Sequence, residues 1–145
     1  MLNPDFKEFL QSLNDSEVKY LVVGGYAVAY HGYPRYTKDL DIWIEMSPEN
    51  ADRIIQAIHR FGFGDLDLEA GDLCEPDRVI QLGYPPVRID LITSMEGVVF
   101  EECHASRVET AIEGVTTPFI DLESLKKNKQ ATGRHQDLAD LENLD

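Results

Sequence analysis

Two aspartates separated by a single residue are the first feature of the chain that could do chemistry. Asp39 and Asp41 begin the segment DLDIWIE (39–45), in which apolar residues occupy every second position. On an extended strand, residues two apart share a face, so the two carboxylates would lie side by side. Bound Mg²⁺ would relieve their repulsion, because one or two carboxylates and substrate phosphates satisfy this hard cation. A solvent-facing strand with incidental acids is the alternative.

A third acid, Asp90, lies in the apolar segment VRIDLI (87–92). Ile89 and Leu91 are expected to form the buried face of a strand there, and an acid within such a strand needs a reason. Asp90 could be a further carboxylate of the same site. An ordinary surface pair with Arg88, which shares its face, is the alternative.

A glycine pair offers a place for phosphate. Gly24 and Gly25 follow an apolar strand-like run (20–23) and precede a short helical stretch (26–31). Glycine lets a backbone approach a ligand closely, and the free N–H groups at a helix start attract phosphate. A tight turn without a ligand is the alternative. Arg35, Thr37 and Lys38 precede the acidic pair and could also meet a phosphate.

The chain contains a second DLD tripeptide, whose sequence context does not indicate a site. Asp65 and Asp67 lie between Gly64 and Gly71 rather than at the start of an apolar strand. Nothing in that acidic connector would hold the two carboxylates rigidly. We therefore predict a solvated loop or a short irregular helix there, without a role in the site.

The elements that must position these residues follow from periodicity and capping signals. The patterns predict one α/β (α+β) domain. Helices are expected over residues 4–16, 26–31, 48–60, 100–111, 121–131 and 137–144, and strands over 20–23, 39–45, 79–82, 87–92 and 115–120.

Composition limits the partners. The chain has 27 acidic and 13 basic residues and a formal net charge of −14, so its overall field repels DNA, RNA and anionic membranes. A nucleotide ligand would need a divalent cation and a few local Lys or Arg side chains. No apolar stretch reaches eighteen residues, and the N-terminus lacks the pattern of a signal peptide. Cys74 and Cys103 are expected to be free thiols, which favours the cytoplasm.

Together, the glycine pair, the DxD at a strand start and the later single Asp resemble the DNA polymerase beta-type nucleotidyltransferase superfamily. The resemblance is strongest to small bacterial proteins grouped with abortive-infection (AbiEii-like) nucleotidyltransferase toxins. It rests on VGGYAVAYHGYPRYTKDLDIWI (23–44), RVIQLGYPPVRIDLIT (78–93) and NKQATGRHQDLADLENL (128–144). It implies a single nucleotidyltransferase domain over residues 1–145. A mixed twisted sheet flanked by helices would form a core at about 18–120, followed by a helical segment at about 121–145.

The resemblance also implies roles for particular residues. Three carboxylates would be catalytic and bind Mg²⁺ or Mn²⁺, namely Asp39, Asp41 and Asp90. Nucleotide-binding residues would be Gly24, Gly25, Arg35, Thr37, Lys129 and Arg134. Lys129 and Arg134 belong with Asp137 to a C-terminal signature in which the lysine faces the nucleotide.

The implied reaction moves a nucleoside monophosphate from an NTP to an acceptor hydroxyl and releases pyrophosphate. The acceptor could be the end of an RNA or tRNA, a protein or a small molecule. A role in a toxin–antitoxin or phage-defence system, with an antitoxin or a second copy of the chain as partner, also follows from the resemblance. Two alternatives stay open: a non-catalytic nucleotide-binding or regulatory module of the same fold, and an unrelated metal-dependent phosphohydrolase.

Overall fold

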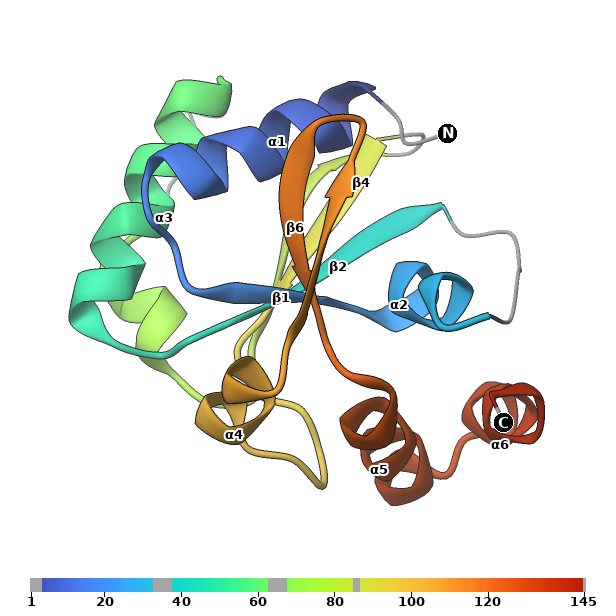
Figure 1. Ribbon diagram of the computed structural model, residues 1–145. Coiled ribbons are helices and arrows are strands. Elements are labelled where there is room, and N and C mark those ends of the chain that lie inside the picture. Colours follow the sequence, from blue (N-terminus) through green and yellow to red (C-terminus); the bar gives the residue numbers. More distant parts are fainter. Residues whose placement is uncertain (1–3, 33–37, 63–67, 85–86, 145) are drawn as a thin grey trace.

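The computed structural model describes residues 4–32, 38–62, 68–84 and 87–144. Its helices and strands are interspersed along the chain, and the chain ends on two consecutive helices (Figure 1). The helices are α1 (Pro4–Asp15), α2 (Gly24–Tyr30), α3 (Pro48–Phe61), the 3₁₀ helix η1 (Ala70–Cys74), α4 (Phe100–Ala105), α5 (Leu122–Thr132) and α6 (His135–Asn143). The strands are β1 (Tyr20–Val23), β2 (Asp39–Ile44), β3 (Val79–Tyr84), β4 (Val87–Ile92), β5 (Val108–Ile112) and β6 (Val115–Phe119).

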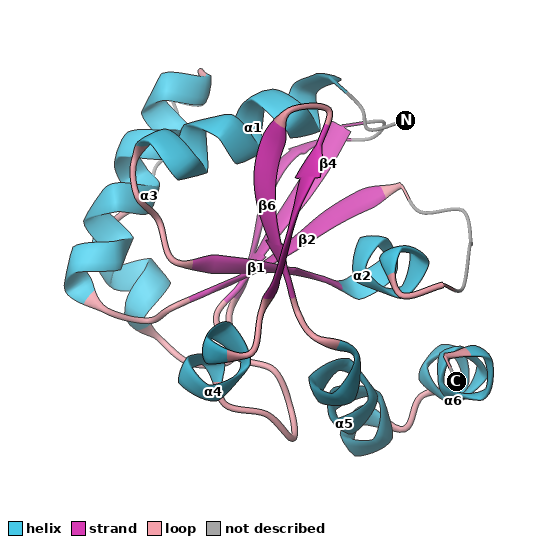
Figure 2. Cartoon of the chain, in the orientation of Figure 1, coloured by secondary structure: helices cyan, strands magenta, loops and turns pink. Residues whose placement is uncertain are grey.

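The described strands form one mixed sheet in the order β3-β4-β2-β1-β6-β5. β2 runs parallel to β4 and β1 runs parallel to β6, while the other neighbours are antiparallel. Figure 2 shows that helices flank this sheet, with α1 and α3 on one side and α4 and α5 on the other. The predicted fold class, a mixed sheet flanked by helices, is confirmed.

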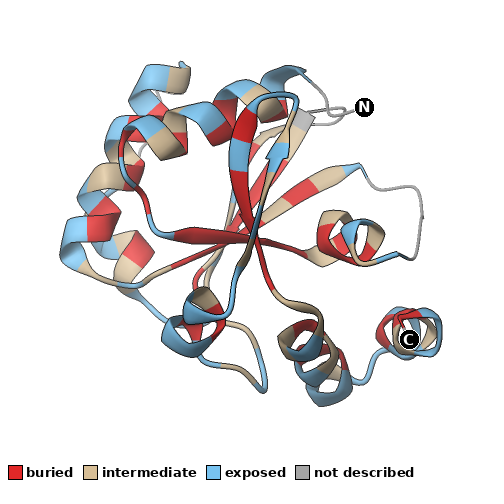
Figure 3. Ribbon diagram, in the orientation of Figure 1, coloured by how far each residue is buried: buried red, intermediate tan, exposed pale blue. Residues whose placement is uncertain are grey.

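Apolar stripes fasten the helices to the sheet. On α1 the residues Phe6, Phe9, Leu10 and Leu13 form one buried apolar stripe, and on β2 the alternate residues Leu40, Ile42 and Ile44 are buried (Figure 3). Ser47 caps α3 by accepting a hydrogen bond from the Asn50 N–H, as its position before Pro48 suggests. The core thus lies between the sheet and its helices.

The helix predicted over 100–111 is wrong in its second half. The helix ends at Ala105, and Val108–Ile112 is strand β5, paired antiparallel with β6. Alternating exposure along VETAI is the strand signal, and a two-residue turn with positive φ at Glu113 and Gly114 closes the hairpin. Hairpin pairing outweighs the helical spacing of these residues.

Most other boundaries differ from prediction by one or two residues, and two of these differences concern predicted site segments. The glycine pair does not precede α2 but forms its first turn, because the helix begins at Gly24. The last helix begins at His135 rather than at residue 137. Among the described residues, no helix is both long and apolar enough to span a membrane. Both cysteines are free thiols.

Candidate functional site

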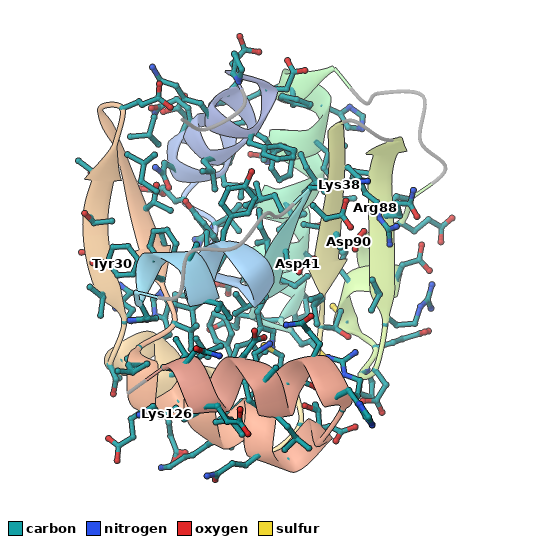
Figure 4. The ribbon with its side chains drawn as sticks, turned by 90° about the vertical axis from the view of Figure 1, so that its right-hand side faces the viewer. Tyr30, Lys38, Asp41, Arg88, Asp90 and Lys126 are labelled. Atoms are coloured by element: carbon teal, nitrogen blue, oxygen red, sulfur yellow. The ribbon has the colours of Figure 1, made fainter. Side chains whose placement is uncertain are left out.

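Two neighbouring strands bring the predicted acids together. β2 and β4 are parallel, and their register pairs Asp41 with Asp90 and Asp39 with Arg88. Residues paired in register point to the same side of a sheet, and adjacent strands lie about 4.8 Å apart. Figure 4 shows Asp41, Arg88 and Asp90 beside one end of α2. We call Asp39, Asp41, Arg88 and Asp90 the carboxylate site.

Arg88 is the cation of this site. Its Nε and Nη2 each lie 3.1 Å from one of the two carboxylate oxygens of Asp90, a two-pronged contact. Its Nε also lies 3.9 Å from Asp39 Oδ2. The Asp90–Arg88 pair considered from the sequence therefore forms, but Asp90 is only 7% exposed, so this is not an ordinary surface pair. Arg88 was not among the predicted site residues. The available signal was its position two residues before Asp90, which places both side chains on one face of the strand.

Among the described residues, too little positive charge surrounds Asp41 to offset its burial and its acidic neighbours. Burial, followed by the negative charges of Asp90 and Asp39, raises the pKa of Asp41 from 3.8 to about 6. Arg88 and Lys129 oppose that rise only in part. A divalent cation ligated by Asp41 and Asp90 would supply the missing charge, so the donor set fits Mg²⁺. As the described side chains stand, no group of three or more His, Cys, Asp or Glu could hold a metal ion.

Gly24 leaves room for the Asp41 carboxylate. A Cβ atom added to Gly24 would lie 2.1 Å from Asp41 Oδ2, and Gly24 has a φ of +67°. Val23, the residue before it, is the register partner of Asp41 on the neighbouring strand. Any other residue at position 24 would therefore both strain the backbone and displace the carboxylate. Gly25 is buried within the same helical turn.

The other predicted site residues are distributed as follows. Arg35 and Thr37 lie outside the described residues, as do Asp65 and Asp67 of the second DLD tripeptide. Lys38 is exposed at the start of β2, on the side that Figure 4 shows.

Lys129 and Arg134 lie in a separate group of charges at the junction of α5 and α6. Lys129 is buried, and its Nζ lies 3.0 Å from Asp137 Oδ1 and 3.0 Å from Asp140 Oδ2. Arg134 is largely exposed and its Nε donates to Asp137 Oδ2 at 2.7 Å. We call Lys129, Arg134, Asp137 and Asp140 the C-terminal ion cluster. Asp140 was not among the predicted site residues.

The charges of this cluster lower the pKa of Asp137, whereas the surroundings of Asp41 raise its pKa. Burial alone would raise the pKa of Asp137, but hydrogen bonds from Arg134, Thr132 and Lys129, together with the charge of Lys129, hold it well below its usual range. The charge of Lys129 also lowers the pKa of Asp41. The two groups of charges are therefore within electrostatic reach of each other.

The chain is similar to known proteins in sequence and in fold. The family described as aminoglycoside-2''-adenylyltransferase matches residues 5–144. No curated protein sequence matches the chain. A predicted nucleotidyltransferase from Thermotoga maritima superimposes with a TM-score of 0.61 at 16% identity, covering 98% of this chain and 93% of the other. An antigenic nucleotidyltransferase-like protein from Paracoccidioides brasiliensis gives 0.56 at 16% identity, covering 95% and 71%. At such low identity, the two structures show the shared fold alone.

Proposed function

This chain belongs to the aminoglycoside-2''-adenylyltransferase family, and we propose that it transfers the AMP part of ATP to a hydroxyl of a cationic small molecule. The nucleotidyltransferase identity predicted from the sequence is confirmed at the level of the family. The AbiEii-like subgroup and a toxin–antitoxin role remain predictions.

The observation that carries the proposal is the pairing of Asp41 with Asp90 beside Gly24, with the pKa of Asp41 raised to about 6. Mg²⁺ bound by these two carboxylates would supply positive charge to the nucleotide phosphates and acidify the acceptor hydroxyl. Arg88 orients Asp90 through its two-pronged contact.

The chemistry required of the site is a displacement at the α-phosphorus. The acceptor oxygen forms a bond to that phosphorus, the bond to the bridging oxygen of the β-phosphate breaks, and pyrophosphate leaves. The hydroxyl proton passes to a carboxylate of the site. Asp41 and Asp90, paired in register on adjacent strands, are the two carboxylates placed to accept it.

Charge favours a cationic acceptor. With a net charge of −14, the chain attracts an amine-bearing small molecule and repels an RNA or tRNA end. A small-molecule acceptor therefore suits this chain better than the nucleic acids that the resemblance also allowed.

The test is an acceptor screen with each of the four α-labelled NTPs and Mg²⁺. Acceptors are an aminoglycoside with a free 2''-hydroxyl, total RNA and cell lysate, and Asp41→Asn is the inactive control. We expect label from ATP on the aminoglycoside, with pyrophosphate released. Label on RNA or protein would show that the acceptor is a macromolecule and not a cationic small molecule. ATP binding without transfer to any acceptor would instead support the non-catalytic nucleotide-binding module.

A further inference from the structure

The ammonium of Lys129 is held by two acids from the next helix. Asp137 and Asp140 lie three residues apart on α6, so both carboxylates face α5. Lys129 donates to Asp137 Oδ1, and its Nζ is also 3.0 Å from Asp140 Oδ2. All three residues are at most 5% exposed. The ammonium is therefore fixed from two sides.

Each acid is itself held by other groups. Thr132 Oγ1 donates to Asp137 Oδ2 at 2.6 Å, beside the bond from Arg134. Gln136 Nε2 donates to Asp140 Oδ1 at 2.9 Å. Both carboxylates are thus oriented before they meet Lys129, and their position defines where its charge lies.

Stability alone is a poor explanation for such a cluster. Every buried charge loses its hydration, and replacing buried ion pairs with apolar side chains often leaves a protein equally or more stable. Apolar side chains could join α5 to α6 without that penalty. The arrangement is better explained by the place in which it holds a positive charge.

That place lies within electrostatic range of the carboxylate site, because the charge of Lys129 lowers the pKa of Asp41. Figure 4 shows α5 and α6 running beneath α2, whose first turn contacts Asp41. A lysine ammonium has three donors; Lys129 donates one hydrogen bond to Asp137, and Asp140 Oδ2 lies at ion-pair distance from its Nζ.

We infer that Asp137 and Asp140 are positioning residues that hold the Lys129 ammonium where it meets the β,γ-phosphates of the bound nucleotide. The inference rests on the proposed function. It makes α6 part of the nucleotide site, although neither aspartate touches the nucleotide.

Asp140→Asn is the decisive variant. It removes one charge but keeps an oxygen that can accept from Gln136, and it leaves the Lys129–Asp137 pair to hold the fold. Glu142→Gln, exposed on the same helix, removes the same charge away from Lys129 and serves as the matched control. Binding of ATP and of AMP, both with Mg²⁺, is measured by calorimetry below the melting temperature of every variant.

We expect Asp140→Asn to weaken ATP binding about tenfold, the worth of a charge-assisted hydrogen bond, and to change AMP binding less than about twofold. KM for ATP should rise more than kcat falls. Glu142→Gln should bind both nucleotides as the parent does. Equal weakening of ATP and AMP by Asp140→Asn, or of neither, would assign the cluster to structure alone and overturn the inference.

A double-variant cycle tests whether Asp140 acts through Lys129. Lys129→Met removes the charge at nearly constant volume, and Lys129→Met with Asp140→Asn also removes the acid left unpaired. On the Lys129→Met background, Asp140→Asn should change ATP affinity less than about twofold and should raise the melting temperature. Additive losses in ATP affinity would overturn the inference. Failure of the parent to bind ATP would overturn the proposed function with it, whereas failure of the variants to differ would overturn this inference alone.

Discussion

The carboxylate site and the C-terminal ion cluster contain the same kinds of side chain and treat their aspartates in opposite ways. In the carboxylate site, three acids share one guanidinium, and the pKa of Asp41 rises to about 6. In the ion cluster, two acids meet two cations, and the pKa of Asp137 falls below its usual range. Each group contains buried charged residues, such as Asp90 in the first and Asp137 in the second, so burial does not distinguish them.

The two groups differ in the source of the positive charge that balances their carboxylates. The ion cluster is neutral by itself, and its hydrogen bonds orient every acid. Among the residues that the structure describes, the carboxylate site has excess negative charge that a bound ligand can neutralise. Perturbed groups of that kind mark functional sites, whereas balanced networks hold structure or position a neighbour. The following predictions test this contrast.

The largest effect is expected at Asp41. Asp41→Asn should lower turnover by roughly 10³-fold, because the site loses a carboxylate proposed to bind the metal ion. In the absence of metal, its melting temperature should equal or exceed that of the parent, since a repelling charge disappears. Mg²⁺ with ATP should raise the melting temperature of the parent but not that of Asp39→Asn with Asp41→Asn. A full metal-dependent rise in that double variant would move the site elsewhere.

Asp137→Asn should lower the stability of the protein, which Asp41→Asn leaves unchanged or raises. Removing one partner of a buried pair leaves Lys129 partly uncompensated and costs about 3–5 kcal/mol of unfolding free energy. Urea denaturation measures this loss, with Glu142→Gln as the control for charge on the same helix. If Asp137→Asn were as stable as Asp41→Asn, the contrast between the two groups would fail.

Gly24→Ala should affect both stability and turnover. An alanine at a φ of +67° costs about 1–3 kcal/mol, and its Cβ would displace the Asp41 carboxylate. Gly114→Ala is the matched control, because Gly114 has a φ of +87° but nothing within 4 Å of an added Cβ. We expect similar stability losses in the two variants but loss of turnover in Gly24→Ala alone. Normal turnover in Gly24→Ala would show that Asp41 can move without consequence.

The pH dependence of stability should separate the two aspartates by sign. Folding raises the pKa of Asp41 from 3.8 to about 6, so the folded protein holds this proton more tightly. Its stabilising contribution is present below pH 4 and disappears as pH rises to about 6, by at most about 3 kcal/mol. Asp137, with its lowered pKa, contributes stability above its unfolded pKa that is lost as pH falls. The metal-free unfolding free energy of the parent minus that of Asp41→Asn, measured by urea titration from pH 4 to 7, should show the first effect. A flat difference would contradict the unbalanced charge assigned to Asp41.

The smallest effect is expected at the second DLD tripeptide. Asp65→Asn with Asp67→Asn should leave ATP affinity within about twofold and stability within about 0.5 kcal/mol, as for ordinary surface positions. Calorimetry with ATP and Mg²⁺ measures the affinity. A loss as large as that of Asp41→Asn would assign the acidic connector to the site after all.

Local patterns were sufficient for most elements. Ser47 and Asp121 cap α3 and α5, and both are residue types that the sequence alone marks as helix starts. Periodicity failed at 108–112, where helical and strand spacing both fit a short apolar pattern. There, the pairing partner β6 decided the outcome.

The sequence by itself determined the order of the acids, their alternation along each strand and the nucleotidyltransferase resemblance, because these depend on spacing along one segment. Only the tertiary structure decided that Asp41 faces Asp90, that Gly24 makes room for it, and that Asp140 holds Lys129. Each of these facts joins segments that are distant along the chain. Register, close approach and charge balance arise between elements, and no periodicity within one element records them.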